Sequence, residues 1–156
     1  MRGERSVSLS DLRAKPSVLI GAYDNEWTLS LAGDLRFFFD SGEDGHAQII
    51  RDKQNPAATD WKLIDAWPPG RDISKDYGLI IRVVSRTTER PVVIVGGIAQ
   101  YGTQAAAEFV TDAAYFEQAL THAPSDWYRK NIEIVISTRV LSGVSGPPTP
   151  VAAYFW

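Results

Sequence analysis

Short runs of apolar and β-branched residues, separated by polar turns, predict strands along the chain. The first run covers residues 16–21 (PSVLIG) and alternates poorly, which is typical of a strand buried on both faces. Residues 26–33 (EWTLSLAG) favour a short helix, and residues 35–40 predict a second strand. This succession of strand, helix and strand predicts a compact βαβ unit.

A short helix is predicted just before this unit, over residues 10–15 (SDLRAK). Ser8 and Ser10 are candidate N-caps, and Asp11 places a negative charge in the first turn, where the helix dipole favours it. Pro16 ends the helix, because the residue before a proline is disfavoured in helical conformation.

The middle of the chain indicates antiparallel pairing. Four ranges predict strands: 46–52, 60–67, 76–86 and 90–97. Asn55 and Pro56 form a turn signal between the first two, and residues 67–72 (WPPGRD) predict a loop. The last two strands are joined by a short polar connection, which favours an antiparallel hairpin.

A helix is predicted from about Thr103 to Pro124. Its apolar positions repeat at spacings of three and four, which places them on one helical face: Ala106, Phe109, Ala113, Phe116 and Leu120. Thr111 and Asp112 offer a second cap that would divide it into two shorter helices. A long strand over 131–141, a loop rich in glycine and proline, and a final strand over 151–156 complete the chain.

Crossovers and hairpins together predict an α/β fold. We expect a three-layer mixed sheet of the flavodoxin-like or Rossmann-like type, with antiparallel hairpins at its edge. A chain of 156 residues has the length of one domain, so residues 1–156 are predicted to form a single α/β domain.

The amino-acid composition excludes several kinds of site and binding partner. With no cysteine, the chain has no disulfide, thiolate metal site or cysteine nucleophile. The net charge of -3 gives no basic excess for a phosphate backbone, so we expect no nucleic-acid binding through this domain. No apolar run approaches the ~20 residues that span a bilayer. We therefore expect a cytoplasmic domain without membrane contact.

The sequence GGIAQYGT, residues 96–103, is the most specific local feature. Gly97 and Gly102 have the spacing of a phosphate-binding loop between a strand and a helix. Thr103 follows directly, but the lysine that the nucleotide triphosphate motif requires is missing. Two interpretations stay open: an anion site at the helix start, or a tight turn whose helix Thr103 caps.

A second polar loop, Tyr23-Asp24-Asn25, follows the first predicted strand. If that strand is parallel to the strand before Gly97, both loops lie at the carboxyl edge of one sheet, where open α/β sheets bind ligands. Trp27 and Tyr101 would add stacking faces to Tyr23. The alternative is that Asp24 and Asn25 only cap the helix that follows.

Catalytic patterns are weak. His46 and His122 lie in no motif and are expected at the surface. The run around Ser145 is not a nucleophile elbow, because its spacing and context differ. A pocket that gathered Asp24, Asp76 and His46 would support an enzyme. We predict no catalytic residue, no metal ligand and no particular cofactor.

Several stretches, in order, carry a resemblance that runs over residues 9–156. They are DLRAKPSVLIGAYDNEWTLSLAGDLRFFF, RDKQNP, DW, DYGLIIRVV, GGIAQYGTQAAAEFVTD, GVSGPP and AYFW. The chain resembles a C-terminal α/β domain of uncharacterised function found in acidobacterial multidomain proteins of regulatory type. This resemblance implies that the chain is the C-terminal part of a longer protein. It also implies that the first βα unit of a doubly wound fold is missing from this chain. It transfers no catalytic residue.

Three functions follow as hypotheses. The first is a non-catalytic ligand-binding or sensory module of a bacterial regulatory protein, with a small anionic or nucleotide-like ligand at the carboxyl edge. Its site would comprise Tyr23, Asp24, Asn25, Trp27, Gly97, Tyr101, Gly102 and Thr103. Valine at Gly102 would then abolish binding in a folded domain.

The second hypothesis is a protein-interaction or dimerisation domain that uses edge strands. The third is a hydrolase or transferase with carboxylate or metal-assisted chemistry.

Overall fold

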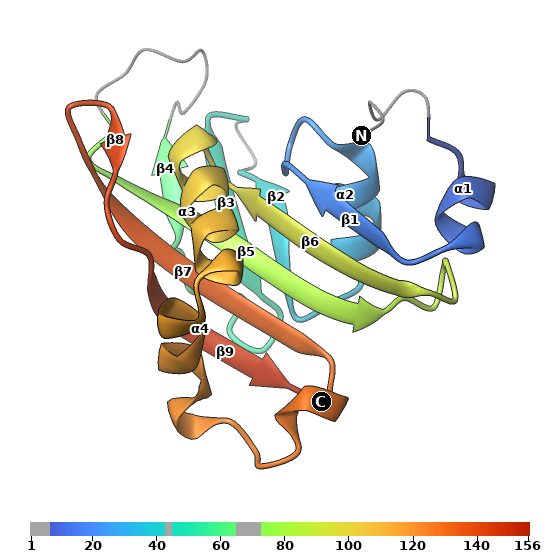
Figure 1. Cartoon of the computed structure of the whole chain (residues 1–156). Coiled ribbons are helices and arrows are strands. Elements are labelled where there is room, and N and C mark those ends of the chain that lie inside the picture. The colour runs from blue at the N-terminus through green and yellow to red at the C-terminus, as the bar shows by residue number, and fades with distance from the viewer. Residues whose placement is uncertain (1–6, 43–44, 65–72) are drawn as a thin grey trace.

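A six-stranded mixed sheet runs through the middle of the molecule (Figure 1). The computed structural model describes residues 7–42, 45–64 and 73–156. The sheet begins with β1 (Ser17–Ile20), β6 (Pro91–Gly97), β5 (Lys75–Val84) and β7 (Ile132–Leu141). Two strands, β8 (Val144–Ser145) and β9 (Thr149–Phe155), both pair with β7. Among the described strands, only β1 and β6 run parallel.

Two consecutive helices cover one face of this sheet, α3 (Gln100–Thr111) and α4 (Ala113–Ala119). Alternate strand residues point toward them, so Ile80, Val95 and Ile134 share a core with Phe109 of α3. Short 3₁₀ turns at Leu120–His122 and Trp127–Arg129 then lead back to β7.

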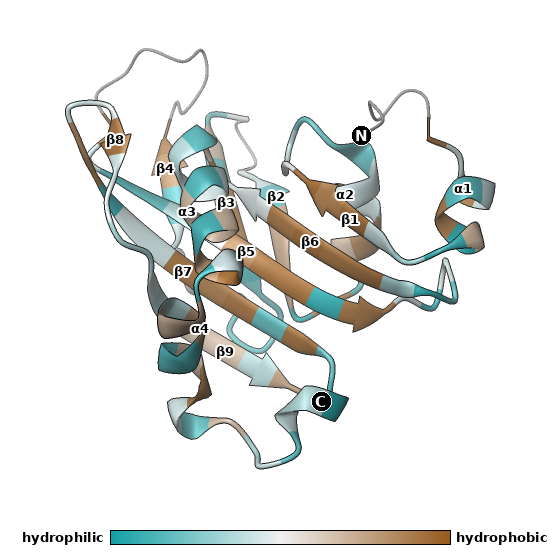
Figure 2. Cartoon of the chain, viewed as in Figure 1, coloured by the Kyte–Doolittle hydropathy of each residue, from teal (hydrophilic) through white to brown (hydrophobic). Residues whose placement is uncertain are grey.

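The opposite face is covered by a small antiparallel sheet and two more helices. These are β2 (Phe37–Ser41), β3 (Ala47–Asp52), β4 (Lys62–Ile64), α1 (Leu9–Ala14) and α2 (Glu26–Ala32). Phe37, Phe39 and Ile50 form one core with Leu79 and Ile81 of β5. Figure 2 shows the resulting hydrophobic colour along β5 and β6. Both faces of the central strands are therefore buried.

The structure confirms the mixed α/β class and most of the predicted elements. The hairpin of β5 and β6 and the pairing of β9 with β7 are present. Asp112 divides the long helix as predicted, since its side chain accepts a hydrogen bond from the N–H of Ala114. A three-layer flavodoxin-like arrangement is not confirmed, because the described strands contain a single parallel pair.

Three details of the prediction are wrong. The strand after α2 does not complete a βαβ unit, because β2 pairs with β3 and buries Phe37 between the two sheets. β1 is not buried on both faces: as an edge strand beyond α3 it leaves the side chains of Val18 and Ile20 exposed. Helix α3 begins at Gln100, three residues before Thr103. The predicted loop at 67–72 lies outside the described residues.

Candidate functional site

The two predicted loops meet at the carboxyl edge of the parallel pair. Gly96, near the end of β6, packs so closely on Gly21 that a Cβ at Gly96 would lie 2.8 Å from the Gly21 carbonyl oxygen. After β1 the chain enters α2 on one face, and after β6 it enters α3 on the other. Divergent connections of this kind mark the place where open α/β sheets bind ligands.

The glycines of the second loop serve close packing. A Cβ at Gly97 would lie 2.1 Å from the Thr103 amide nitrogen, and one at Gly102 would lie 2.1 Å from the Tyr77 carbonyl oxygen. Thr103 does not begin the helix. Its hydroxyl oxygen accepts a hydrogen bond from the N–H of Gly97 at 2.9 Å and thereby joins the first turn of α3 to β6.

The chain's own carboxylate occupies the start of α3. Asp76, the second residue of β5, is fully buried and accepts hydrogen bonds from the N–H groups of Gly102 at 2.6 Å and Ala99 at 3.2 Å. It also accepts one from the N–H of Tyr77. Burial raises the pKa of Asp76 above its ordinary value, whereas these N–H groups lower it. The anion interpretation of the glycine loop requires N–H groups that are free to bind a ligand, and here they bind Asp76 instead.

The first loop is also held by internal hydrogen bonds. Asn25 caps α2 through the N–H groups of Trp27 and Thr28, and its Nδ2 donates to the Ile20 carbonyl at 3.1 Å. Asp24 accepts a hydrogen bond from the N–H of Ala22. Asn25 therefore caps α2 as predicted, whereas the bond of Asp24, which was expected to share this role, lies within the loop.

The three aromatic rings of the predicted site point to different places. The Tyr23 hydroxyl donates to the Asp40 carbonyl and accepts from the N–H of Ile49, and burial raises its pKa. Trp27 Nε1 donates to the Val7 carbonyl. The Tyr101 hydroxyl lies beside Gly143, in the turn before β8. The structure therefore does not gather the three rings around one ligand.

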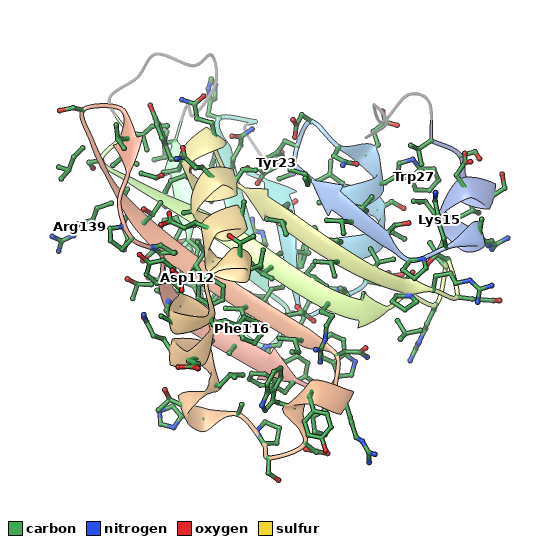
Figure 3. The ribbon with its side chains drawn as sticks, viewed as in Figure 1. Lys15, Tyr23, Trp27, Asp112, Phe116 and Arg139 are labelled. Atoms are coloured by element: carbon green, nitrogen blue, oxygen red, sulfur yellow. The ribbon has the colours of Figure 1, made fainter. Side chains whose placement is uncertain are left out.

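A groove of about 1110 Å³ runs along the open edge of β1. Its lining comes from α1, from all four residues of β1, and from Asp24, Asn25 and Trp27 next to them. Trp27 and Lys15 lie between α1 and α2 in Figure 3. Three residues of the predicted site therefore border this groove, whereas the glycine loop does not.

The edge of β1 exposes backbone hydrogen-bonding groups to the groove. The N–H of Gly21 donates to the Val95 carbonyl of β6, so the N–H of Gly21 points inward. In a strand, the N–H and C=O of one residue point to the same edge, and successive residues point to opposite edges. The N–H and C=O of Val18 and the N–H of Ile20 therefore face outward. No residue in the described parts of the chain adds a strand at this edge. The Ile20 carbonyl also faces outward, where Asn25 satisfies it.

Catalytic groups do not converge in the described residues. Asp76 is buried beneath α3, whereas Asp24 and His46 are exposed, so the cluster that would support an enzyme is not formed. His122 is exposed as well. Over the same parts of the chain, no group of three His, Asp or Glu side chains is placed to hold a metal ion.

One buried carboxyl group was missed in the sequence. Glu133 of β7 is fully buried and accepts hydrogen bonds from the backbone N–H groups of Arg36 and Phe37. Burial raises its pKa from 4.5 to about 7. It does not line the groove, so we assign it to the packing of the two sheets.

Comparison with protein-family models, with curated proteins and with solved structures gave no match. The resemblance to an acidobacterial domain therefore stays a prediction. Among the helices that the structure describes, none is long and apolar enough to cross a membrane.

Proposed function

We propose that this domain is a non-catalytic interaction module that receives an extended protein segment along the edge of β1. The observation that supports it is the open edge itself, whose outward N–H and C=O groups border a groove of about 1110 Å³. Adding a strand to such an edge satisfies these groups and lets neighbouring side chains select the partner. In the setting that the resemblance implies, the module would serve a bacterial regulatory protein.

Side-chain exposure supports the same proposal. Val18 is 64% exposed and Ile20 is 57% exposed, although both belong to a strand. An edge with exposed apolar residues is a site for pairing with another chain. The small-ligand hypothesis has less support, since Asp76 takes the N–H groups of Ala99 and Gly102.

Proline substitutions at two sheet edges test the proposal. Val18→Pro removes an outward N–H from β1 without touching the bonds to β6, and edge strands tolerate proline there. Ala153→Pro is the matched control on β9. The backbone of Trp156 bonds to Asn131, so by alternation the N–H of Ala153 faces away from β7.

The probe is a phage library of random linear peptides, selected on the whole chain. We expect binders whose affinity falls about tenfold or more in Val18→Pro and stays unchanged in Ala153→Pro. Methylation of alternate backbone nitrogens in a selected peptide should abolish its binding. A library without binders, or binders that are indifferent to Val18→Pro, would overturn the proposal.

A further inference from the structure

We propose that the segment received by β1 is β1 of a second copy of this chain, paired antiparallel with Val18 facing Val18. The inference deepens the proposed function and rests on it. An antiparallel pair centred on one residue has a two-fold axis, so both copies use the same surface. Three independent features of the edge fit this pairing.

The first feature is the order of donors and acceptors along the edge. Pro16 presents a carbonyl but has no N–H. Val18 presents both groups. Ile20 presents its N–H, while its carbonyl already accepts from Asn25 Nδ2. Reversed against itself, this edge pairs Val18 with Val18 through two bonds, and the N–H of each Ile20 meets the carbonyl of Pro16 in the other copy.

The same order selects one register. Pro16 has no N–H to donate, and the Ile20 carbonyl opposite it already accepts a hydrogen bond from Asn25. A shift by two residues would place Val18 opposite Ile20, and the N–H of Val18 would then face a carbonyl that Asn25 already bonds. A general peptide brings an N–H opposite the Ile20 carbonyl as well, and this N–H would have to share that carbonyl with Asn25. The edge is therefore complementary to itself.

The second feature is the apolar surface. Directly opposite residues of an antiparallel pair lie on the same face of the sheet, so Val18 would pack on Val18 and Ile20 on Pro16. Val18 and Ile20 lie opposite Val93 and Val95, which belong to the core under α3, but their own side chains at the edge of the sheet are exposed. Pairing would shield apolar surface that nothing in the described chain covers.

The third feature is charge. In this register Lys15 of one copy faces Gly21 of the other. Asp24 fills the side-chain place of Gly21, because its Oδ1 lies 2.6 Å from the position of a Cβ there. Lys15 and Asp24 are both exposed and both border the groove. Each dimer would therefore contain two Lys15–Asp24 pairs, one at each end of the joined strands.

The first experiment is sedimentation velocity of the whole chain over a range of concentrations. A short edge contact gives a weak dimer, so the range should reach about 100 μM. We expect reversible dimers for the parent chain and for Ala153→Pro, and monomers for Val18→Pro. Circular dichroism and thermal unfolding verify that each variant is folded.

The second experiment exchanges the charges between copies. Lys15→Glu and Asp24→Lys each place two like-charged pairs in a homodimer, so each dimer should weaken by about tenfold. Mixed together, the two variants restore two opposite-charge pairs. We expect the mixture to form heterodimers about as tightly as the parent chain forms homodimers. A mixture that associates no better than either variant alone would overturn the assigned register.

The outcomes separate this inference from the proposed function. A chain that stays monomeric while selected peptides still bind in a Val18-dependent manner overturns the second copy and leaves the proposed function intact. A dimer that persists in Val18→Pro lies elsewhere and also overturns the inference. Loss of both peptide binding and dimers overturns both.

Discussion

At the scale of single residues, Gly102 shows how one pattern supports two interpretations. The spacing of Gly97 and Gly102 suggested a loop around an anion. In the structure, a Cβ at Gly102 would lie 2.1 Å from the carbonyl oxygen of Tyr77, so the missing side chain lets α3 approach β5. The two interpretations could not be separated from the sequence, because both need a glycine where backbones come close.

Alanine at Gly102 should therefore destabilise the fold. The Cβ would meet backbone on a packed strand, which cannot move aside as a flexible side chain can, so we expect a loss of about 3 kcal/mol or more. Gly45→Ala is the control: it has open space but a φ of +71°, and should cost only about 1 kcal/mol. Denaturant unfolding measures both. Equal losses would contradict the packing role. Valine at Gly102 cannot separate binding from folding for the same reason.

At the scale of elements, the sequence predicts best what its local signals control. The caps Ser8, Asn25 and Asp112 each lie next to the helix that they start, and all three helices were predicted. Helix α3 has no side-chain cap at Ala99, and its start is bonded by Asp76 from β5. That contact joins residues distant in sequence, so the predicted start was three residues late. The pairing of β2 with β3 was missed for another reason: the two strands are consecutive, with Ser41 opposite Gln48, but β2 had been assigned to a βαβ unit.

Removal of Asp76 should free the start of α3 for an anion. Asp76→Ala leaves the N–H groups of Ala99 and Gly102 unpaired at the start of α3. Inorganic phosphate should then raise the melting temperature of this variant by several degrees over chloride at equal ionic strength, and leave the parent chain unchanged. Asp112→Ala removes the exposed cap of α4 and should show no such response. Equal responses of all three proteins would contradict the assignment.

At the scale of the whole molecule, a buried polar contact joins the two sheets. The Glu133 carboxylate of β7 accepts hydrogen bonds from the start of β2, where Arg36 pairs with Asp52 at 2.8 Å. The Arg36 guanidinium also lies over the Tyr154 ring of β9, 5.0 Å from its centre. The strand around Glu133 was predicted, but its burial was not. A charged residue in a strand is usually exposed, but here the start of β2 binds the buried Glu133 side chain.

The pH dependence of stability should report on this contact. The pKa of Glu133 rises from 4.5 to about 7 on burial, so the folded chain holds the proton more tightly than the unfolded chain. The contribution to the free energy of unfolding is therefore complete below about pH 4.5 and falls as the pH rises through 7, by up to about 3 kcal/mol. Asp76, whose pKa is also raised, acts in the same direction and stays in every variant compared. Glu133→Gln should flatten the profile between about pH 4.5 and about pH 7, whereas the exposed Glu117→Gln should leave it unchanged. Chemical unfolding across this range measures the slopes. A parent chain whose stability rises toward pH 8 would show instead that Glu133 is bound in its charged form, held by Arg36 and the N–H groups of β2.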